Sequence, residues 1–204
     1  MNQALLTFFE QHYAPGRVGL IGQDDLKGTL IRGAEAGLTP DHRPSKWSHT
    51  FLMGERRRDG NVYIFESDLR VSVKDWEVQN GVMESRIVKW CLDDVSHGCV
   101  LGMDLTADLA QRLVTKGLEY AYDEDHLRYP VGELFGTLWA IITHRMARRN
   151  IFDDKHAVQC ATFVRMCYQA IGRDPVTGPV AISNTSPESY YQSHAFTFRR
   201  EWHV

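Results

Sequence analysis

The stretch "HAVQCATFVRMCYQAIG" (residues 156–172) holds two of the four cysteines of this 204-residue chain. From Cys160 onward its apolar residues recur at helical spacing, so that one face consists of Phe163, Val164, Cys167, Tyr168 and Ile171. Gly172 is the residue type that commonly follows the last turn of a helix. The sequence therefore predicts a helix that begins near Cys160 and packs Cys167 into the core.

The position of Cys160 leaves two roles open. A thiol in the first turn of a helix lies near unpaired backbone N–H groups and the positive end of the helix dipole. Both favour the thiolate, which is the nucleophilic form, and the same N–H groups can stabilise an oxyanion. Taken alone, a cysteine at such a position is more often a structural thiol than a nucleophile. A nucleophile would also need a base, and the base would need an orienting group.

Of the nine histidines, His49 is the first candidate for the base, because it lies within an expected strand, "KWSHTFLMG" (46–54). Strand alternation predicts that four side chains share one face, namely Trp47, His49, Phe51 and Met53. His156 is the second candidate, since it lies only four residues before Cys160, but an expected loop holds it less rigidly.

The next expected strand, "NVYIFESDL" (61–69), carries Glu66 and Asp68 on one face. A carboxylate on an apolar strand face is costly to bury unless it has a partner. Either acid could accept the proton on Nδ1 of His49 and hold the ring toward a thiol.

The remaining patterns predict an α+β fold with an antiparallel sheet packed against helices, in one domain over residues 1–204, because strands come first and helices later. Helices are expected over 2–14, 24–37 (capped by Asp24), 105–122 (capped by Thr106) and from Pro130 to 150. Further strands are expected over 17–22, 84–93 and 98–105, and the tail after residue 175 is expected to be loop and extended chain.

Composition excludes several functions. The net charge of −3 with no long run of one sign argues against a nucleic-acid partner. The N-terminus lacks a signal-peptide pattern and no apolar run reaches membrane-spanning length, so we expect a cytoplasmic protein without stable membrane insertion and with reduced cysteines. The spacing of Cys91, His97 and Cys99 matches no common zinc pattern, and we expect no metal and no organic cofactor.

The order of a strand histidine, an acid on the next strand and a late cysteine at a helix start resembles the circularly permuted papain-like hydrolases of the NlpC superfamily, in particular the YiiX/YaeF-like proteins. The pieces that carry the resemblance are "WSHTFLMG", "YIFESDLRVSV", "LTADLAQRLVTKGLEYAYD", "QCATFVRMCYQAIG" and "NTSPESYYQSHAF". The chain departs from the family in having Ala161 where serine often follows the cysteine, and "RVGLIG" in place of a "GDIL"-like opening strand.

The resemblance implies a permuted papain-like fold with Cys160 as nucleophile, His49 as base and Glu66 as the orienting residue. It implies hydrolysis of a small peptide, an amide or an acyl ester through an acyl-enzyme, and Trp47 and Tyr122 are candidates for substrate contacts. Two alternatives stay open. The fold could serve as a non-catalytic ligand-binding or interaction module, or as a lipid acyltransferase or thioesterase. The sequence predicts no oligomeric state.

Overall fold

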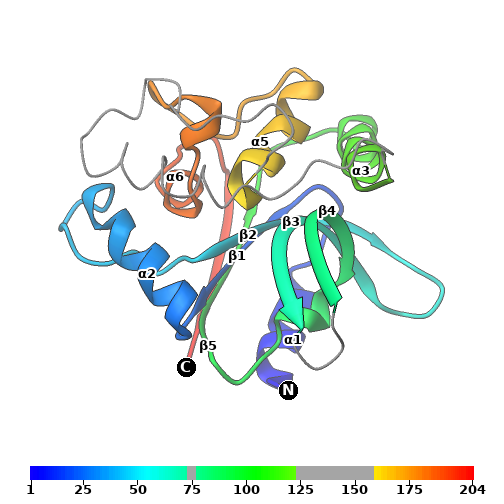
Figure 1. The fold of residues 1–204 in the computed structure, drawn as a ribbon. Helices are drawn as coiled ribbons and strands as arrows, with labels where there is room; N and C mark the ends of the chain where they lie inside the picture. The colour runs from blue at the N-terminus through cyan, green and yellow to red at the C-terminus, as the bar shows by residue number, and fades with distance from the viewer. Residues whose placement is uncertain (73–76, 123–158) are drawn as a thin grey trace.

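A six-stranded antiparallel sheet organises the computed structural model, which describes residues 1–72, 77–122 and 159–204 (Figure 1). The strand order is β4-β3-β2-β1-β5-β6. The strands are β1 (Val18–Gln23), β2 (His49–Arg56), β3 (Val62–Ser72), β4 (Glu77–Arg86), β5 (Val95–Gly102) and β6 (Phe198–His203). The expected α+β class with an antiparallel sheet is confirmed.

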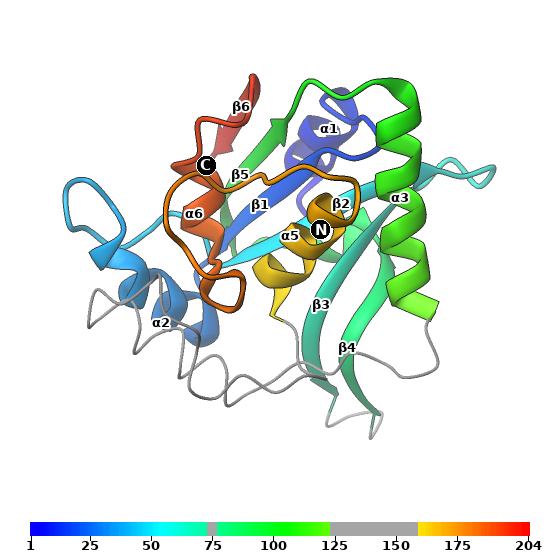
Figure 2. The same ribbon diagram turned by 90° about the horizontal axis from the view of Figure 1, so that it is seen from above.

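Helices cover both faces of the sheet (Figures 1 and 2). One face carries α3 (Ala107–Tyr122), α5 (Cys160–Ala170) and α6 (Pro187–Tyr191), and the other carries α1 (Gln3–Gln11). The connection between β1 and β2 contains α2 (Leu26–Ala34) and the 3₁₀ helix η1 (Glu35–Gly37). Short 3₁₀ helices also occur as η2 (Ile87–Trp90) and η3 (Ile182–Asn184).

Alternation along the strands produces two separate cores. Leu52 of β2 and Phe65 of β3 pack with α3 and α5, whereas Met53 and Ile64 pack with α1 on the opposite face. Eight of the eleven residues of α5 are buried, and Gly172 lies in the left-handed region after the end of the helix (φ 74°). The site described below lies where this buried helix begins.

Four details of the expected elements are wrong. Asp25 caps α2 in place of Asp24, since its Oδ1 accepts a hydrogen bond from the Gly28 N–H at 2.6 Å. Trp47 precedes β2 and packs on the α5 side, so it does not share a face with Phe51 and Met53. The expected strand over 84–93 is the end of β4 followed by the 3₁₀ helix η2.

The tail is the fourth correction, because it is more regular than expected. Ser186 caps α6 in a reciprocal capping box with Ser189, and Pro187 begins the helix. The final residues form β6, which pairs with β5 at the edge of the sheet. The helix expected from Pro130 to 150 lies outside the described residues.

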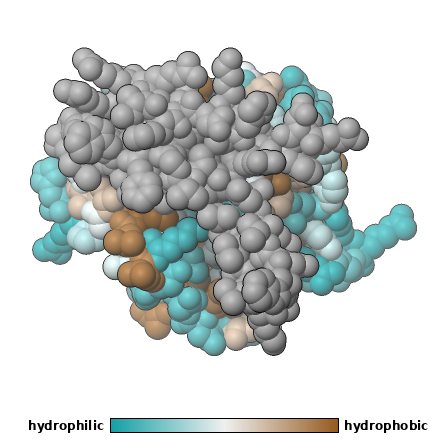
Figure 3. Space-filling model, viewed as in Figure 1, coloured by the Kyte–Doolittle hydropathy of each residue, from teal (hydrophilic) through white to brown (hydrophobic). Residues whose placement is uncertain are grey.

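An apolar patch on α2 is the clearest surface feature of the side shown in Figure 3. Leu26 and Leu30, one turn apart, are 79% and 63% exposed, while Gly28 and Ile31 face inward. Among the described residues, no helix is both long enough and apolar enough to cross a lipid bilayer.

Candidate active site

Cys160 is the first residue of α5 and lies over the sheet with only 7% of its surface exposed. The Gln159 residue that precedes it has the backbone conformation of an N-cap, but its side chain does not cap the helix. The N-cap side chain, which accepts a hydrogen bond from a first-turn N–H group in many helices, thus does not do so here. The expected placement of Cys160 at a helix start is confirmed.

His49 begins β2 in the centre of the sheet, where it pairs with Ile21 of β1, and its side chain is buried. Its Nε2 donates a hydrogen bond to Oε2 of Glu66 at 2.9 Å. The imidazole of His49 also forms a hydrogen bond with the Cys160 thiol. The expectation that the acid would take the proton on Nδ1 is wrong, because Glu66 takes Nε2 and Nδ1 is left for the sulfur.

Glu66 is completely buried, and among the described residues its hydrogen-bond partners are donors. Besides His49, it accepts hydrogen bonds from Nζ of Lys89 at 2.7 Å and from Nε1 of Trp90 at 2.6 Å. Asp68 is also buried, but it pairs with Lys89 and Lys27, both at 3.1 Å. Of the two acids that the sequence left open, Glu66 is therefore the one that contacts the histidine.

The pKa of Cys160 is lowered and that of His49 is raised, and both shifts favour a thiolate beside an imidazolium. Burial opposes the charged form of the thiol, but the His49 charge, its hydrogen bond and the Thr50 backbone N–H outweigh it, so the pKa of Cys160 is lowered. Burial likewise opposes charge on His49, but Cys160 and then Glu66 raise its pKa from 6.5 to about 9. Burial would raise the pKa of Glu66 too, yet the His49 hydrogen bond and the nearby charges lower it.

The other three cysteines lie within the described ranges and behave as core thiols. Burial raises the pKa of Cys91 and Cys99 to about 12, and it also raises that of Cys167. Cys91 belongs to the core on the α1 side and Cys99 to the core on the α5 side, so the two do not converge with His97 on one site. Within the described residues, no group of three or more His, Cys, Asp or Glu side chains is arranged to hold a metal ion.

The two aromatic candidates for substrate contacts differ in burial: Trp47 belongs to the same core cluster as Cys160, whereas Tyr122 lies at the surface. Trp47 is 1% exposed and packs against the rings of His97 and Tyr191. Tyr122 ends α3, is 66% exposed, and donates its hydroxyl hydrogen bond to Glu84 on β4. The second base candidate, His156, lies outside the described residues.

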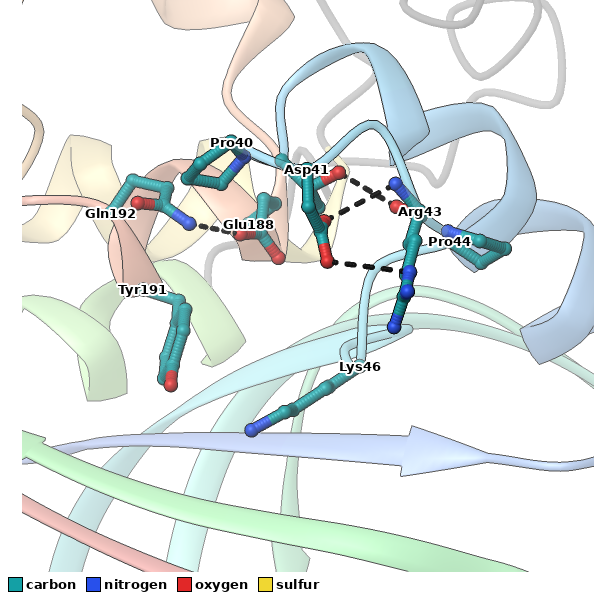
Figure 4. Close-up of a pocket in the computed structure, with 9 residues that line it drawn as sticks. Pro40, Asp41, Arg43, Pro44, Lys46, Glu188, Tyr191 and Gln192 are labelled. Carbon is teal, nitrogen blue, oxygen red and sulfur yellow. Dashed lines mark hydrogen bonds and ion pairs between the residues drawn. The ribbon is translucent and has the colours of Figure 1, made fainter.

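A pocket of about 530 Å³ lies between the loop that leads into β2 and helix α6 (Figure 4). Its lining consists of Thr39, Pro40, Asp41, Arg43, Pro44, Lys46, Glu188, Tyr191 and Gln192. Oε2 of Glu188 accepts a hydrogen bond from Ser45 at 2.5 Å, and its backbone N–H donates to Glu35 at 3.3 Å. The pKa of Glu35 is raised well above its usual value, first by burial, then by the charge of Glu188, and to a smaller extent by Cys160. A buried carboxyl that contacts the lining residue Glu188 is therefore within electrostatic reach of the thiol.

Sequence reasoning missed Lys89 and Trp90. Both lie on η2, within the stretch "ESRIVKWCLD" that is expected to be a strand because Ile87, Val88 and Trp90 are residue types that favour strands. The only signal in the sequence is chemical, since a buried carboxylate such as Glu66 accepts several hydrogen bonds and His49 is the one donor that the sequence suggests.

The geometry supplies a thiol of lowered pKa at a helix N-terminus and an imidazole that is held by a buried carboxylate. These are the components of nucleophilic acyl transfer. Neither a scan against protein-family models nor a search of curated proteins finds a match to this chain.

Proposed function

We propose that this protein is a cysteine hydrolase that cleaves amide or ester bonds through an acyl-enzyme on Cys160, on a circularly permuted papain-like fold. The contact of His49 with both Cys160 and Glu66 carries the proposal. The order of these residues along the chain, base and acid before nucleophile, supports the permuted arrangement. A structural thiol explains neither the lowered pKa of Cys160 nor the buried polar contacts of His49.

In the first half of the reaction, the Cys160 thiolate attacks the carbonyl carbon of the substrate. The resulting oxyanion accepts hydrogen bonds from the Cys160 backbone N–H and a second donor. The His49 imidazolium gives its Nδ1 proton to the leaving nitrogen or oxygen as the C–N or C–O bond breaks. A thioester on Cys160 and a neutral His49 remain.

In the second half, neutral His49 takes a proton from water, whose oxygen attacks the thioester carbonyl. The C–S bond breaks, the acid is released, and the thiolate–imidazolium pair is restored. Throughout, Glu66 holds Nε2 and stabilises the charged ring. An acceptor other than water at the second step would make the protein an acyltransferase.

The pocket of Figure 4 is the proposed place for the substrate group next to the scissile bond. Lys46, which lines the pocket, lies three positions before His49. Glu188, which also lines it, contacts Glu35, and the charge of Cys160 contributes to the raised pKa of Glu35. The prolines and Tyr191 provide apolar surface, and Glu188 and Gln192 provide hydrogen-bonding groups.

The test is to trap the acyl-enzyme. Wild-type protein and the Cys160→Ala variant are incubated with a panel of activated esters and aminoacyl anilides, quenched in acid, and analysed by peptide mass spectrometry. An acyl adduct on Cys160 with release of the leaving group supports the proposal. Equal turnover by both proteins, or no adduct and no turnover with any member of the panel, favours the non-catalytic binding module.

A further inference from the structure

The short helix η2 presents two neighbouring residues to one carboxylate. Lys89 reaches Oε1 of Glu66 at 2.7 Å, and the next residue, Trp90, reaches Oε2 at 2.6 Å. In an extended strand, adjacent side chains point to opposite faces and could not meet at one group. The 3₁₀ turn over Ile87–Trp90 is therefore the local structure that brings both donors to Glu66.

We propose that Lys89 and Trp90 are positioning residues of the Cys160 site, and that Asp68 holds Lys89 in place. This inference rests on the proposed function. Lys89 bridges the two acids of β3, with Nζ 2.7 Å from Glu66 and 3.1 Å from Asp68. Glu66 and Asp68 lie two residues apart on one strand face, so without a cation between them their charges would repel each other.

The charged groups around Glu66 alternate in sign from one contact to the next. Starting at the thiolate of Cys160, the order is His49, Glu66, Lys89, Asp68 and Lys27. Lys27 on α2 also acts electrostatically on Cys160, so the last cation of the series favours the thiolate directly. On the opposite strand, β4 places the uncharged Met83 beside Glu66. Buried charges arranged in this way offset one another's cost of desolvation.

Trp90 adds a geometric constraint to the electrostatic one. Its ring lies against the imidazole of His49, with ring centroids 4.3 Å apart and planes tilted by 35°. The same indole donates its N–H to the oxygen of Glu66 that also accepts from His49. Trp90 therefore fixes both partners of the His49–Glu66 hydrogen bond.

The N-terminal helix holds η2 against the sheet. The backbone N–H of Asn2 donates to the carbonyl of Cys91 at 2.8 Å, directly after η2, and Ile87 and Trp90 pack in the same core as Leu5 and Phe9. The positioning segment is thus rigidly supported from the face of the sheet opposite to α5.

The test is the pH dependence of iodoacetamide alkylation of Cys160 in the full-length protein, for wild type, Lys89→Met and Lys89→Arg. In Lys89→Met the cation is lost, Glu66 keeps the repulsion of Asp68, and its carboxylate protonates at a higher pH. The acid limb, which is the pH range over which the alkylation rate of Cys160 rises with pH, should then move to higher pH by about one unit or more. Lys89→Arg keeps the charge and should leave the limb close to that of wild type. Trp90→Phe keeps the ring but not the N–H, and should move the limb in the same direction by a smaller amount.

A merely structural role for Lys89 would lower the folded fraction and leave the limb unmoved. A Lys89→Met limb that coincides with wild type in the folded protein, checked by circular dichroism, overturns the inference. If Lys89→Met does not fold, Lys89→Gln provides the same comparison, because it keeps a donor and loses the charge. Failure of the proposed function gives a different result, namely wild-type alkylation of Cys160 that does not depend on His49.

Discussion

Nε2 of His49 donates a hydrogen bond to Oε2 of Glu66 over 2.9 Å, and this contact decides which ring nitrogen serves Cys160. Because the carboxylate occupies Nε2, Nδ1 is the atom left for exchange of a proton with the sulfur and the substrate. The carboxylate also favours the imidazolium over the neutral ring. The consequences of this contact can be separated from those of the neighbouring acid, Asp68.

Glu66→Gln removes the negative charge beside His49 while keeping the shape of the side chain. We expect kcat/KM toward any substrate found for the protein to fall about 10²-fold or more, because the imidazolium loses its stabilising charge. Asp68→Asn is the matched control, since Asp68 contacts Lys89 and Lys27 but not His49. Steady-state kinetics on folded protein compare the two, and an equal loss in both variants would contradict the assignment of Glu66.

The pH profile of kcat/KM should be bell-shaped. The alkaline limb should lie near pH 9, because the pKa of His49 is raised to about 9 and the ring must be protonated to serve the leaving group. The acid limb should lie below the usual pKa of a thiol, about 8.5, because the pKa of Cys160 is lowered. Activity that rises steadily through pH 9 would rule out a pre-formed ion pair.

Arg165 ties α5 to the segment that follows it. Its guanidinium contacts both oxygens of Asp174 at 2.9 Å, the Val180 carbonyl at 2.9 Å and the Thr185 hydroxyl at 3.0 Å, although it is only 4% exposed. We expect Arg165→Met to lower the free energy of unfolding by about 2–3 kcal/mol, because buried acceptors lose a charged donor. Arg165→Lys should recover only part of this, since one ammonium cannot reproduce the forked geometry. Urea unfolding measures both, and equal stability of Arg165→Met and wild type would contradict the anchoring role.

Gly22 of β1 allows the segment that leads to His49 to pass close to the β1 backbone. A Cβ at this position would lie 1.9 Å from the Lys46 carbonyl oxygen, a backbone atom. We expect Gly22→Ala to lower the free energy of unfolding by about 1–3 kcal/mol and to slow Cys160 alkylation, because segment 46–49 must shift.

Gly33 on α2 offers the control for this variant, since nothing lies within 4 Å of a Cβ built there. Gly33→Ala should stabilise the protein by about 0.5–1 kcal/mol through its helix propensity and leave alkylation unchanged. A Gly22→Ala variant that matches Gly33→Ala in both measurements would show that the close approach has no consequence.

The parts of the site that lie on long periodic elements could be predicted from the sequence. Strand alternation placed His49 and Glu66 on adjacent strands, and the apolar face of residues 160–171 placed Cys160 at a helix start. The choice between Glu66 and Asp68 could not be made, because both share a strand face and only the twist and register of the sheet decide which one reaches His49.

The remaining differences have local physical causes. Two adjacent aspartates, Asp24 and Asp25, are equivalent N-cap candidates, and the fold uses the second, while the first pairs with Arg32. Residues 87–90 contain two β-branched residues and an aromatic one, which favour a strand, but they form a 3₁₀ turn, because tertiary contacts of Lys89 and Trp90 with Glu66 outweigh the local preference. The start of α6 did carry a signal, a serine followed by proline, although the helix itself is only five residues long.

The most direct test of the central claim is the pH dependence of iodoacetamide labelling, mapped to each cysteine by mass spectrometry, in wild type and His49→Ala. We expect Cys160 to be labelled fastest at neutral pH, with an apparent pKa well below about 8.5, and to lose this advantage in the variant. Cys91, Cys99 and Cys167 should be protected in the folded protein, because burial raises their pKa values. Labelling of Cys160 at the same rate and with the same pH dependence in both proteins would contradict a Cys160–His49 pair.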